Sequence, residues 1–173
     1  MVDAKASDME ESSQWNRKGV EFYSNDEFDK AIECYDKAIR LDPNNVYSWN
    51  NRGNVYLAKE AFDKGDFESA REGFQKLLKR YPDSENADNA QFWIGETYYR
   101  EQWYEKAILE YQKVIEKYPE GNKVQASLLK QGFAFKNLGD KANAGLILKE
   151  LVKKYPDSTE AEIARKKLQE FAP

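Results

Sequence analysis

Residues 28–39 read FDKAIECYDKAI, and within them small alanines at positions 31 and 38 alternate with the bulky Tyr35 at helical spacing. Gly19 precedes this stretch, and Gly53 follows Gly19 after 34 residues. Small residues at such positions let two antiparallel helices approach closely, while large ones fill the space beside them. The stretch therefore predicts the second helix of a two-helix hairpin that is repeated along the chain.

The repeat continues towards the C-terminus, but its period changes from 34 to 37 residues. Pro82, Pro119 and Pro156 recur at the longer interval, and each follows a tyrosine. A proline after the second helix of a pair removes a backbone donor and ends that helix. Because one pair of helices cannot bury its apolar faces alone, successive pairs must stack. We therefore expect an all-α fold, an α-solenoid of about nine antiparallel helices.

The ends of the chain are expected to differ from its middle. A disordered tail is expected at residues 1–11, which are polar and acidic. The last helix carries Ala161, Ile163 and Ala164 on one side and charges on the other, which is typical of a capping helix, and Ser158 should cap its N-terminus. The expected helices lie at about 12–25, 27–41, 46–64, 67–80, 85–101, 103–118, 122–138, 140–154 and 158–171.

One expected helix is longer than the repeat requires. The turn after Gly53 is due near Glu60, but the turn signal Gly65-Asp66 comes five residues later. Five extra residues lengthen a helix by roughly 7.5 Å and rotate its far end by about 140°. We therefore expect one unbroken helix at residues 46–64 that two repeat arrays share.

This shared helix should present one face to each array, the first at residues 12–59 and the second at residues 60–173. The residues expected to face the first array are Trp49, Gly53 and Tyr56. Those expected to face the second array are Leu57, Ala58, Ala61 and Phe62.

Composition argues against several classes of function. The 173 residues contain no histidine and one cysteine, Cys34, so the commonest general base and metal ligand and any thiolate cluster are missing. We expect no enzyme activity, no cofactor and no metal site, and Cys34 to be a small half-buried helix residue. The net charge of −4 disfavours nucleic acid as a partner, because its binders usually neutralise phosphates with a basic face.

Targeting signals are also missing from the sequence. No apolar run approaches the roughly 20 residues that a membrane span needs. The segment Met1–Ser13 is polar and lacks the apolar stretch of a signal peptide. We therefore expect a monomer that stays in the cytoplasm as expressed and makes no membrane contact.

The two parts of the chain resemble different families. Residues 12–59 resemble tetratricopeptide repeats close to consensus, and the stretch at 28–39 carries that match. Residues 60–171 are similar to the C-terminal repeat domain of the Tol-Pal system accessory protein family (CpoB/YbgF). The motif Tyr81-Pro82-Asp83-Ser84 and the stretches at 87–96 and 149–158 carry that similarity. The second resemblance implies a periplasmic protein that contacts TolA and the machinery of cell-wall synthesis at division.

The chain departs from the Tol-Pal family because that family's coiled coil and secretion signal are absent from the sequence. The change of period inside one helix favours an engineered fusion of two natural arrays, and a natural protein with an irregular repeat stays open. We therefore expect a non-catalytic repeat scaffold with no ligand of its own. The alternative is an adaptor that binds a protein or peptide of the Tol-Pal system.

The tetratricopeptide resemblance implies that a ligand would lie against the inner face made by the first helices of the pairs. The residues that this resemblance places on that face are Asn16, Val20, Tyr23, Asn50, Asn54, Phe92, Glu96, Tyr99, Arg100, Leu129, Phe133 and Lys136. Chaperone-binding members of the family hold two carboxylates with a clamp of Lys, Asn and Arg. Asn16 and Val20 replace the first Lys and Asn of that clamp, so we expect no recognition of a chaperone C-terminus.

Residues 92–104 are rich in aromatic side chains, which could anchor a peptide. We expect most of them to fill the core between helices, with Tyr99 and Arg100 as the exposed subset. The aromatic residues are Phe92, Trp93, Tyr98, Tyr99, Trp103 and Tyr104.

Overall fold

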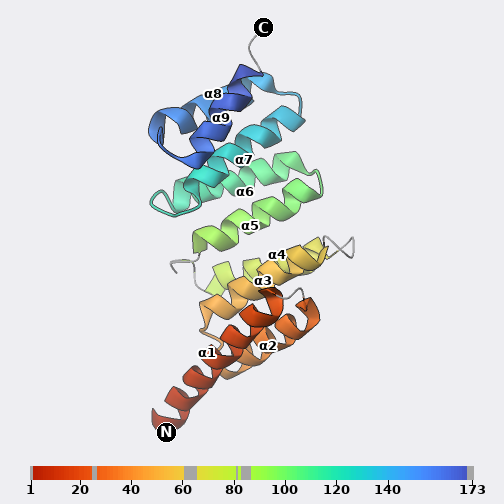
Figure 1. Ribbon diagram of the computed structural model, residues 1–173, viewed down its shortest axis with the longest axis vertical. Coiled ribbons are helices and arrows are strands. Elements are labelled where there is room, and N and C mark those ends of the chain that lie inside the picture. The colour runs from red at the N-terminus through yellow and green to blue at the C-terminus, as the bar shows by residue number, and fades with distance from the viewer. Residues whose placement is uncertain (1, 25–26, 61–65, 81, 83–86, 171–173) are drawn as a thin grey trace. The chain divides into compact units, whose positions relative to one another are not determined.

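The structure is a computed structural model, and it describes residues 2–24, 27–60, 66–80, 82 and 87–170. Within these ranges the regular secondary structure consists of nine α-helices, which confirms the predicted fold class and helix order (Figure 1). The helices are α1 (Val2–Ser24), α2 (Phe28–Leu41), α3 (Val46–Glu60), α4 (Phe67–Arg80), α5 (Ala87–Arg100), α6 (Tyr104–Lys117), α7 (Val124–Asn137), α8 (Lys141–Lys154) and α9 (Thr159–Gln169).

Two predicted helix boundaries need comment: the start of the first helix differs from the prediction, and the predicted end of the third helix lies outside the described residues. Residues 2–11, for which we predicted a disordered tail, are instead helical and continuous with the rest of α1. The hydroxyl of Ser12 donates to the Ala38 carbonyl over 2.8 Å and anchors α1 on α2 just after this segment. The helix that we predicted at residues 46–64 is continuous from Val46 to Glu60, and its predicted continuation at residues 61–64 lies outside the described residues.

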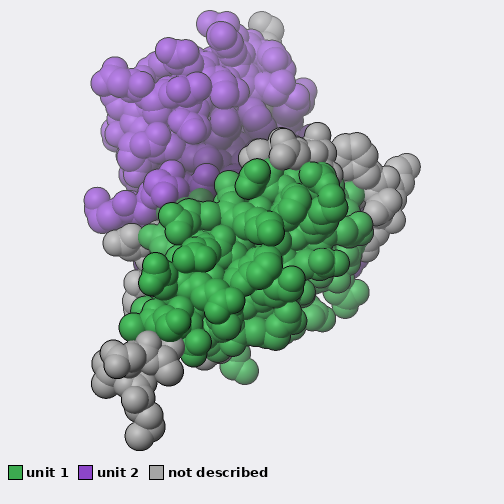
Figure 2. All heavy atoms as spheres, turned by 60° about the horizontal axis from the view of Figure 1, so that its bottom comes forward, with its two compact units in different colours: residues 1–90 green, residues 91–173 purple. Residues whose placement is uncertain are grey.

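The chain divides into two compact units, residues 1–90 and 91–173, which Figure 2 shows in green and purple. The first unit contains α1 to α4 and the second contains α6 to α9, while α5 is divided between them. The predicted change of array at residues 59–60 falls inside the first unit.

A glycine on the first helix of each hairpin in the first unit lies against a ring on the second. A Cβ atom added to Gly19 of α1 would lie 2.5 Å from Cε1 of Tyr35 in α2. One added to Gly53 of α3 would overlap the ring of Phe74 in α4. Both rings are almost fully buried. The absence of a side chain on the glycine thus lets each ring pack against the helix backbone, as the sequence predicts for Gly19.

Helix α3 packs on both of its sequence neighbours. Val55 is fully buried in a cluster with Ala31 and Tyr35 of α2. Arg52 also forms an ion pair with Asp36 of α2, with 2.8 Å between Nε and Oδ1. Because Gly53 faces Phe74, the same helix belongs to the α3–α4 hairpin as well.

The second unit repeats this packing with different side chains. A Cβ atom added to Gly95 of α5 would lie 2.6 Å from Cε1 of Tyr111 in α6. One added to Gly132 of α7 would lie 2.7 Å from Cδ2 of Leu148 in α8. The same geometry therefore recurs at the 37-residue period, with leucine in place of the ring in the last pair.

Helix α9 closes the second unit. Ala161 and Ala164 are fully buried, and Ala164 joins the core cluster that contains Leu148 and Leu151. The hydroxyl of Ser158 accepts from the Ala161 amide over 3.0 Å, which confirms the predicted N-cap. Ile163, which we assigned to the apolar side, is 42% exposed, so the buried stripe of α9 is narrower than the sequence predicts.

Candidate functional site

In the first unit, Asn16, which we predicted on the inner face, makes hydrogen bonds to another helix of the protein. Its Oδ1 accepts from the hydroxyl of Ser48 over 3.3 Å and from the amide of Asn51 over 3.0 Å, which links α1 to α3. Asn45 extends this network, because its amide donates to Ser12 Oγ and its Oδ1 accepts from the Ser48 backbone. Asn16 therefore holds neighbouring helices together rather than presenting an amide to a ligand.

The other predicted residues of α1 and α3 have mixed environments. Val20 and Tyr23 of α1 are exposed, and the Tyr23 ring lies 5.9 Å from that of Phe28. Asn50 and Asn54 of α3 are half-buried, and within the described residues their Oδ1 atoms are buried and accept no hydrogen bond. This half of the inner face thus presents an aliphatic, an aromatic and two amide side chains, and no cation.

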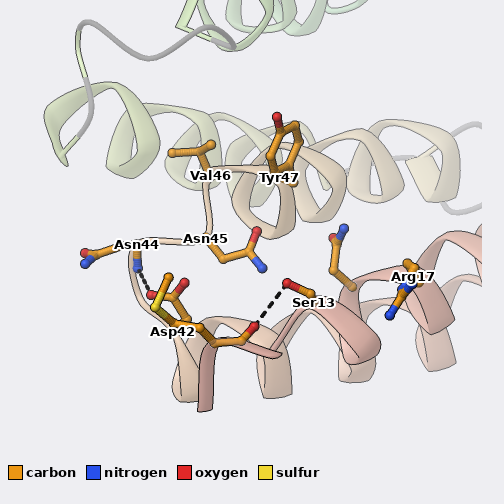
Figure 3. A pocket seen from close by; sticks show the side chains of 9 residues that line it. Ser13, Arg17, Asp42, Asn44, Asn45, Val46 and Tyr47 are labelled. Carbon is orange, nitrogen blue, oxygen red and sulfur yellow. Dashed lines mark hydrogen bonds between the residues drawn. The ribbon is translucent and has the colours of Figure 1, made fainter. Parts of the chain in front are cut away.

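A crevice of about 520 Å³ opens beside this network, between α1 and the connection from α2 to α3. Figure 3 shows Ser13 and Arg17 of α1 on one side of it and Asn44 and Asn45 on the other. Ser13 donates to the Met9 carbonyl, and Asp42 accepts from the Asn44 amide. Because Ser13, Asp42, Asn16 and Asn45 already have hydrogen-bond partners within the fold, we interpret the crevice as a gap between helices and not as a prepared ligand site.

In the second unit, Phe92 and Glu96 of α5 are buried, not ligand-facing. Phe92 is 6% exposed, and its ring lies 5.7 Å from those of Trp93 and Tyr111. The carboxylate of Glu96, also 6% exposed, accepts from the Tyr111 hydroxyl and pairs with Lys130 of α7 over 2.7 Å. Glu96 therefore ties α5 to both α6 and α7.

Tyr99 and Arg100, expected to be exposed together, differ in environment. Tyr99 is half-buried, its ring packs edge-on against Tyr104 at 5.3 Å, and its hydroxyl accepts from the Asn137 amide over 2.9 Å. Burial raises the pKa of Tyr99 above its usual value. Arg100 is exposed, as expected.

The three predicted residues of α7 also differ in their exposure to solvent. Leu129 is 7% exposed and belongs to the core cluster, and Phe133 packs against that cluster. Lys136 is partly exposed, and its ammonium lies 3.8 Å from the carboxylate of Glu170. In this unit Tyr99, Arg100 and Lys136 are thus the predicted residues that reach the surface with polar groups.

Of the six aromatic residues at positions 92–104, Phe92 is buried in the core, and Trp93, Tyr98, Tyr99 and Tyr104 are half-buried. Trp103 is the exception, since it is 47% exposed. Its ring stacks on Tyr98 at 5.9 Å, and the Lys106 ammonium lies 4.1 Å from its centre. Its exposed surface is therefore partly covered by a cation from its own helix hairpin.

Four residues that contact the predicted residues Glu96, Tyr99 and Lys136, or each other, were not predicted as site residues. They are Lys130, Asn137, Lys167 and Glu170. Lys130 and Asn137 lie on α7, one turn before and one turn after Phe133, and they bind Glu96 and Tyr99. Glu96 and Lys130 are 34 residues apart, one helical turn short of the 37-residue period, and this spacing on the consecutive first helices α5 and α7 is a signal that could have paired them. Lys136 and Glu170 have the same separation of 34 residues, so the same signal could have indicated their pairing.

Chemical groups for catalysis or metal binding do not gather in the described part of the chain. No group of three or more Asp, Glu or Cys side chains is arranged there to hold a metal ion. Cys34 is 4% exposed, and burial raises the pKa of its thiol. Among the described helices, none has the length and apolar character needed to cross a membrane.

Two family models match the sequence. The first, described as TPR repeat, matches residues 19–60, and the second, YfiO, described as outer membrane lipoprotein, matches residues 49–172. The chain spans only 6–15% of the length of the curated relatives that it matches. One of them, peptidyl-prolyl cis-trans isomerase FKBP4 of Homo sapiens, is 43% identical over 60 residues, which is 35% of this chain and 12% of FKBP4.

Solved structures share the fold. MamA (41-end) from Desulfovibrio magneticus RS-1 superposes with a TM-score of 0.68 at 19% identity, covering 85% of this chain and 78% of that one. The first TPR of Spaghetti (RPAP3), bound to the HSP90 peptide SRMEEVD, gives a TM-score of 0.62 at 20% identity, covering 76% and 95%. The helices of the described residues, the glycine-centred hairpins and these matches establish a tetratricopeptide-type α-solenoid, an architecture of repeats that serve in protein interaction. Because the second family model covers most of its length, the chain belongs to the outer membrane lipoprotein family YfiO.

Proposed function

We propose that the chain is a repeat scaffold that holds other polypeptides and consists of two arrays joined through α3. The double role of α3 carries this proposal: Val55 packs on α2, and Gly53 lies against Phe74 of α4. The matches of the two family models also overlap on α3, because one ends at residue 60 and the other begins at residue 49. One helix thus serves as the end of one array and the start of the next.

The finer proposal is that the two arrays were joined by engineering. In the first repeat, Asn16 accepts hydrogen bonds from Ser48 and Asn51 on the next first helix. Its equivalent one repeat later is Asn50, whose buried Oδ1 accepts no hydrogen bond within the described residues. These hydrogen bonds between consecutive first helices are present inside the first array and missing at its end. This difference supports the proposal that the two arrays have different origins.

Paired substitutions on the two sides of α3 test the shared helix. Val55→Ala and Phe74→Ala each remove buried side-chain atoms and should lower stability by about 1–3 and 3–5 kcal/mol, respectively. We expect both to shift the same urea-unfolding transition of the first unit. Two separate transitions, each sensitive to only one of the substitutions, would contradict a shared helix.

A second candidate function is an adaptor of the bacterial Tol-Pal envelope system. The exposed Arg100, which follows the half-buried Tyr99 in the chain, favours it, because arginine and tyrosine are enriched among the residues that dominate interfaces. The membership of an outer membrane lipoprotein family is in keeping with an envelope partner.

Immobilised TolA and Pal test this candidate directly. An adaptor should bind one of them in the micromolar range, and Arg100→Ala should weaken binding at least fivefold. Lys149→Ala, which removes an exposed cation from α8, is the matched control and should have no effect. If neither protein is bound, the adaptor function is wrong and the scaffold proposal stands without this partner.

A further inference from the structure

The last turn of α7 and the end of α9 bring two lysines onto one carboxylate. The ammonium groups of Lys136 and Lys167 lie 3.8 and 2.6 Å from the same oxygen, Oε2 of Glu170. One carboxylate balances only one of the two positive charges. Contact with Lys167 lowers the pKa of Lys136, as expected for two cations at close range. The cluster therefore retains a net positive charge.

The neighbouring side chains on α5 do not remove this charge. Tyr99 presents a neutral hydroxyl that accepts from Asn137. The buried carboxylate of Glu96 is already engaged by Tyr111 and Lys130. The side chains of α5, α7 and α9 thus form a patch with hydrogen-bonding groups and an excess of cations.

Glu170 is held loosely in this patch. It follows Gln169, the last residue of α9, and its side chain is 57% exposed. Its backbone amide bonds to the Lys167 carbonyl over 3.2 Å, so the helix itself does not depend on the side chain. Exposed ion pairs of this kind change an equilibrium constant by about fivefold at most. A carboxylate from another molecule can therefore replace that of Glu170.

We propose that Lys136 and Lys167, flanked by Tyr99 and Asn137, bind a carboxylate of an acidic peptide, and that Glu170 occupies this site in the free chain as an intramolecular competitor. This inference rests on the proposed polypeptide-binding function and gives the chemistry of the polypeptide. A peptide suits the site better than a nucleic acid, because the chain carries a net charge of −4 and its cations are confined to one small patch.

Fluorescence anisotropy with a labelled hexaglutamate peptide tests the site on the full chain at low ionic strength. Glu170→Gln removes the competitor and should tighten binding about twofold to fivefold. Lys136→Gln and Lys167→Gln should each weaken it at least threefold. Hexaglutamine, which has the same length without charge, should not bind.

Glu150 and Lys154 on α8 provide matched controls. They form an exposed pair with 2.6 Å between the charged atoms, and Glu150→Gln changes the net charge by the same amount as Glu170→Gln. Neither Glu150→Gln nor Lys154→Gln should change hexaglutamate binding. Because all these side chains are at least partly exposed, the variants should keep the melting temperature of the parent chain.

A double-variant cycle separates competition from a general charge effect. If Glu170 competes for the two lysines, Glu170→Gln should not tighten binding in a chain that also carries Lys136→Gln and Lys167→Gln. Equal tightening by Glu170→Gln and Glu150→Gln would overturn the inference, as would no hexaglutamate binding by any variant. Either result would leave the scaffold proposal intact, because the α3 substitutions test it separately.

Discussion

At the scale of single residues, much of the fold depends on four glycines and on one buried carboxylate. Gly19, Gly53, Gly95 and Gly132 each lie where a Cβ atom would strike a side chain of the paired helix. Glu96 links three helices through Tyr111 and Lys130. These contacts are short-range and steric or charge-assisted, so single substitutions should reveal them.

Gly95→Ala should destabilise the chain although alanine is the better helix former. The new methyl group would lie 2.6 Å from the buried Tyr111 ring, and overpacking of this kind costs about 1–3 kcal/mol. Gly145→Ala, where no atom lies within 4 Å of the new methyl, should instead stabilise by up to about 1 kcal/mol. Urea midpoints measure both, and equal midpoints for the two variants would show that Gly95 is not sterically required.

Tyr111→Phe should destabilise the second unit. The substitution removes the hydroxyl that donates to Glu96, and a hydrogen bond to a charged group contributes about 1.5–3 kcal/mol. Tyr47→Phe, at a site that is 56% exposed, should leave stability unchanged. Thermal and urea unfolding of both variants check this prediction, and a loss below about 0.5 kcal/mol for Tyr111→Phe would contradict it.

The buried tyrosines also predict how stability depends on pH. Burial raises the pKa of Tyr111 and of Tyr35 well above the ordinary tyrosine value of about 10. The folded chain therefore holds these protons more tightly than the unfolded chain, and this stabilising term is complete below the unfolded pKa. It is lost as the pH rises from about 10 towards the folded values. Melting temperatures should fall above pH 10, and less steeply in Tyr111→Phe.

The sequence predicted where residues lie along the repeat better than what they bind. It placed Asn16, Glu96 and Leu129 on first helices correctly. Repeat spacing does not show, however, that Asn16 binds Ser48, that Glu96 binds Lys130, or that Leu129 is buried in a core cluster. Polar pairing between helices depends on side-chain identity at two distant sites. An inner face read from a family pattern therefore includes structural residues along with surface residues.

At the scale of helices, ends are set by caps and turn signals. Helix α8 begins after Asp140, whose carboxylate accepts from the Asn143 amide, and this contact lowers the pKa of Asp140. Helix α9 begins after Ser158, which plays the same part for Ala161. Both caps satisfy amides that the first turn of a helix leaves without a partner.

Ser158→Ala should destabilise α9 by about 1 kcal/mol, because the Ala161 amide loses its acceptor. Ser158→Asp should restore most of the stability, since aspartate is an equally good cap. Thr159→Ala changes an exposed neighbour and serves as the control. Urea unfolding measures the three variants, and a Ser158→Ala chain as stable as the control would refute the capping role.

Helix boundaries could be predicted where turn residues and an apolar stripe recur with the repeat, and less well where they do not. The 37-residue period placed α6, α7 and α8 within about two residues of their observed ends, because turn residues and prolines recur there. The start of α1 was missed because residues 2–11 lack an apolar stripe, and a helix without one leaves no periodic signal.

At the scale of the whole molecule, we propose that two repeat arrays occupy one chain. Family models of different kinds cover residues 19–60 and 49–172, and α3 is the helix that they have in common. In the first unit α3 packs on α2 through Val55 and on α4 through Gly53. Because both contacts are buried, a substitution that destabilises the packing of α2 on α3 should also destabilise the packing of α4 on α3.

Hydrogen exchange of the α4 amides in a chain carrying Tyr35→Ala tests the shared helix most directly. Tyr35 is 1% exposed on α2, and truncating a buried aromatic costs about 3–5 kcal/mol. Tyr47→Ala, at an exposed site on α3, is the control. The account predicts that protection falls in α2, α3 and α4 together. Loss confined to α2, with α4 protected as in the parent chain, would contradict it.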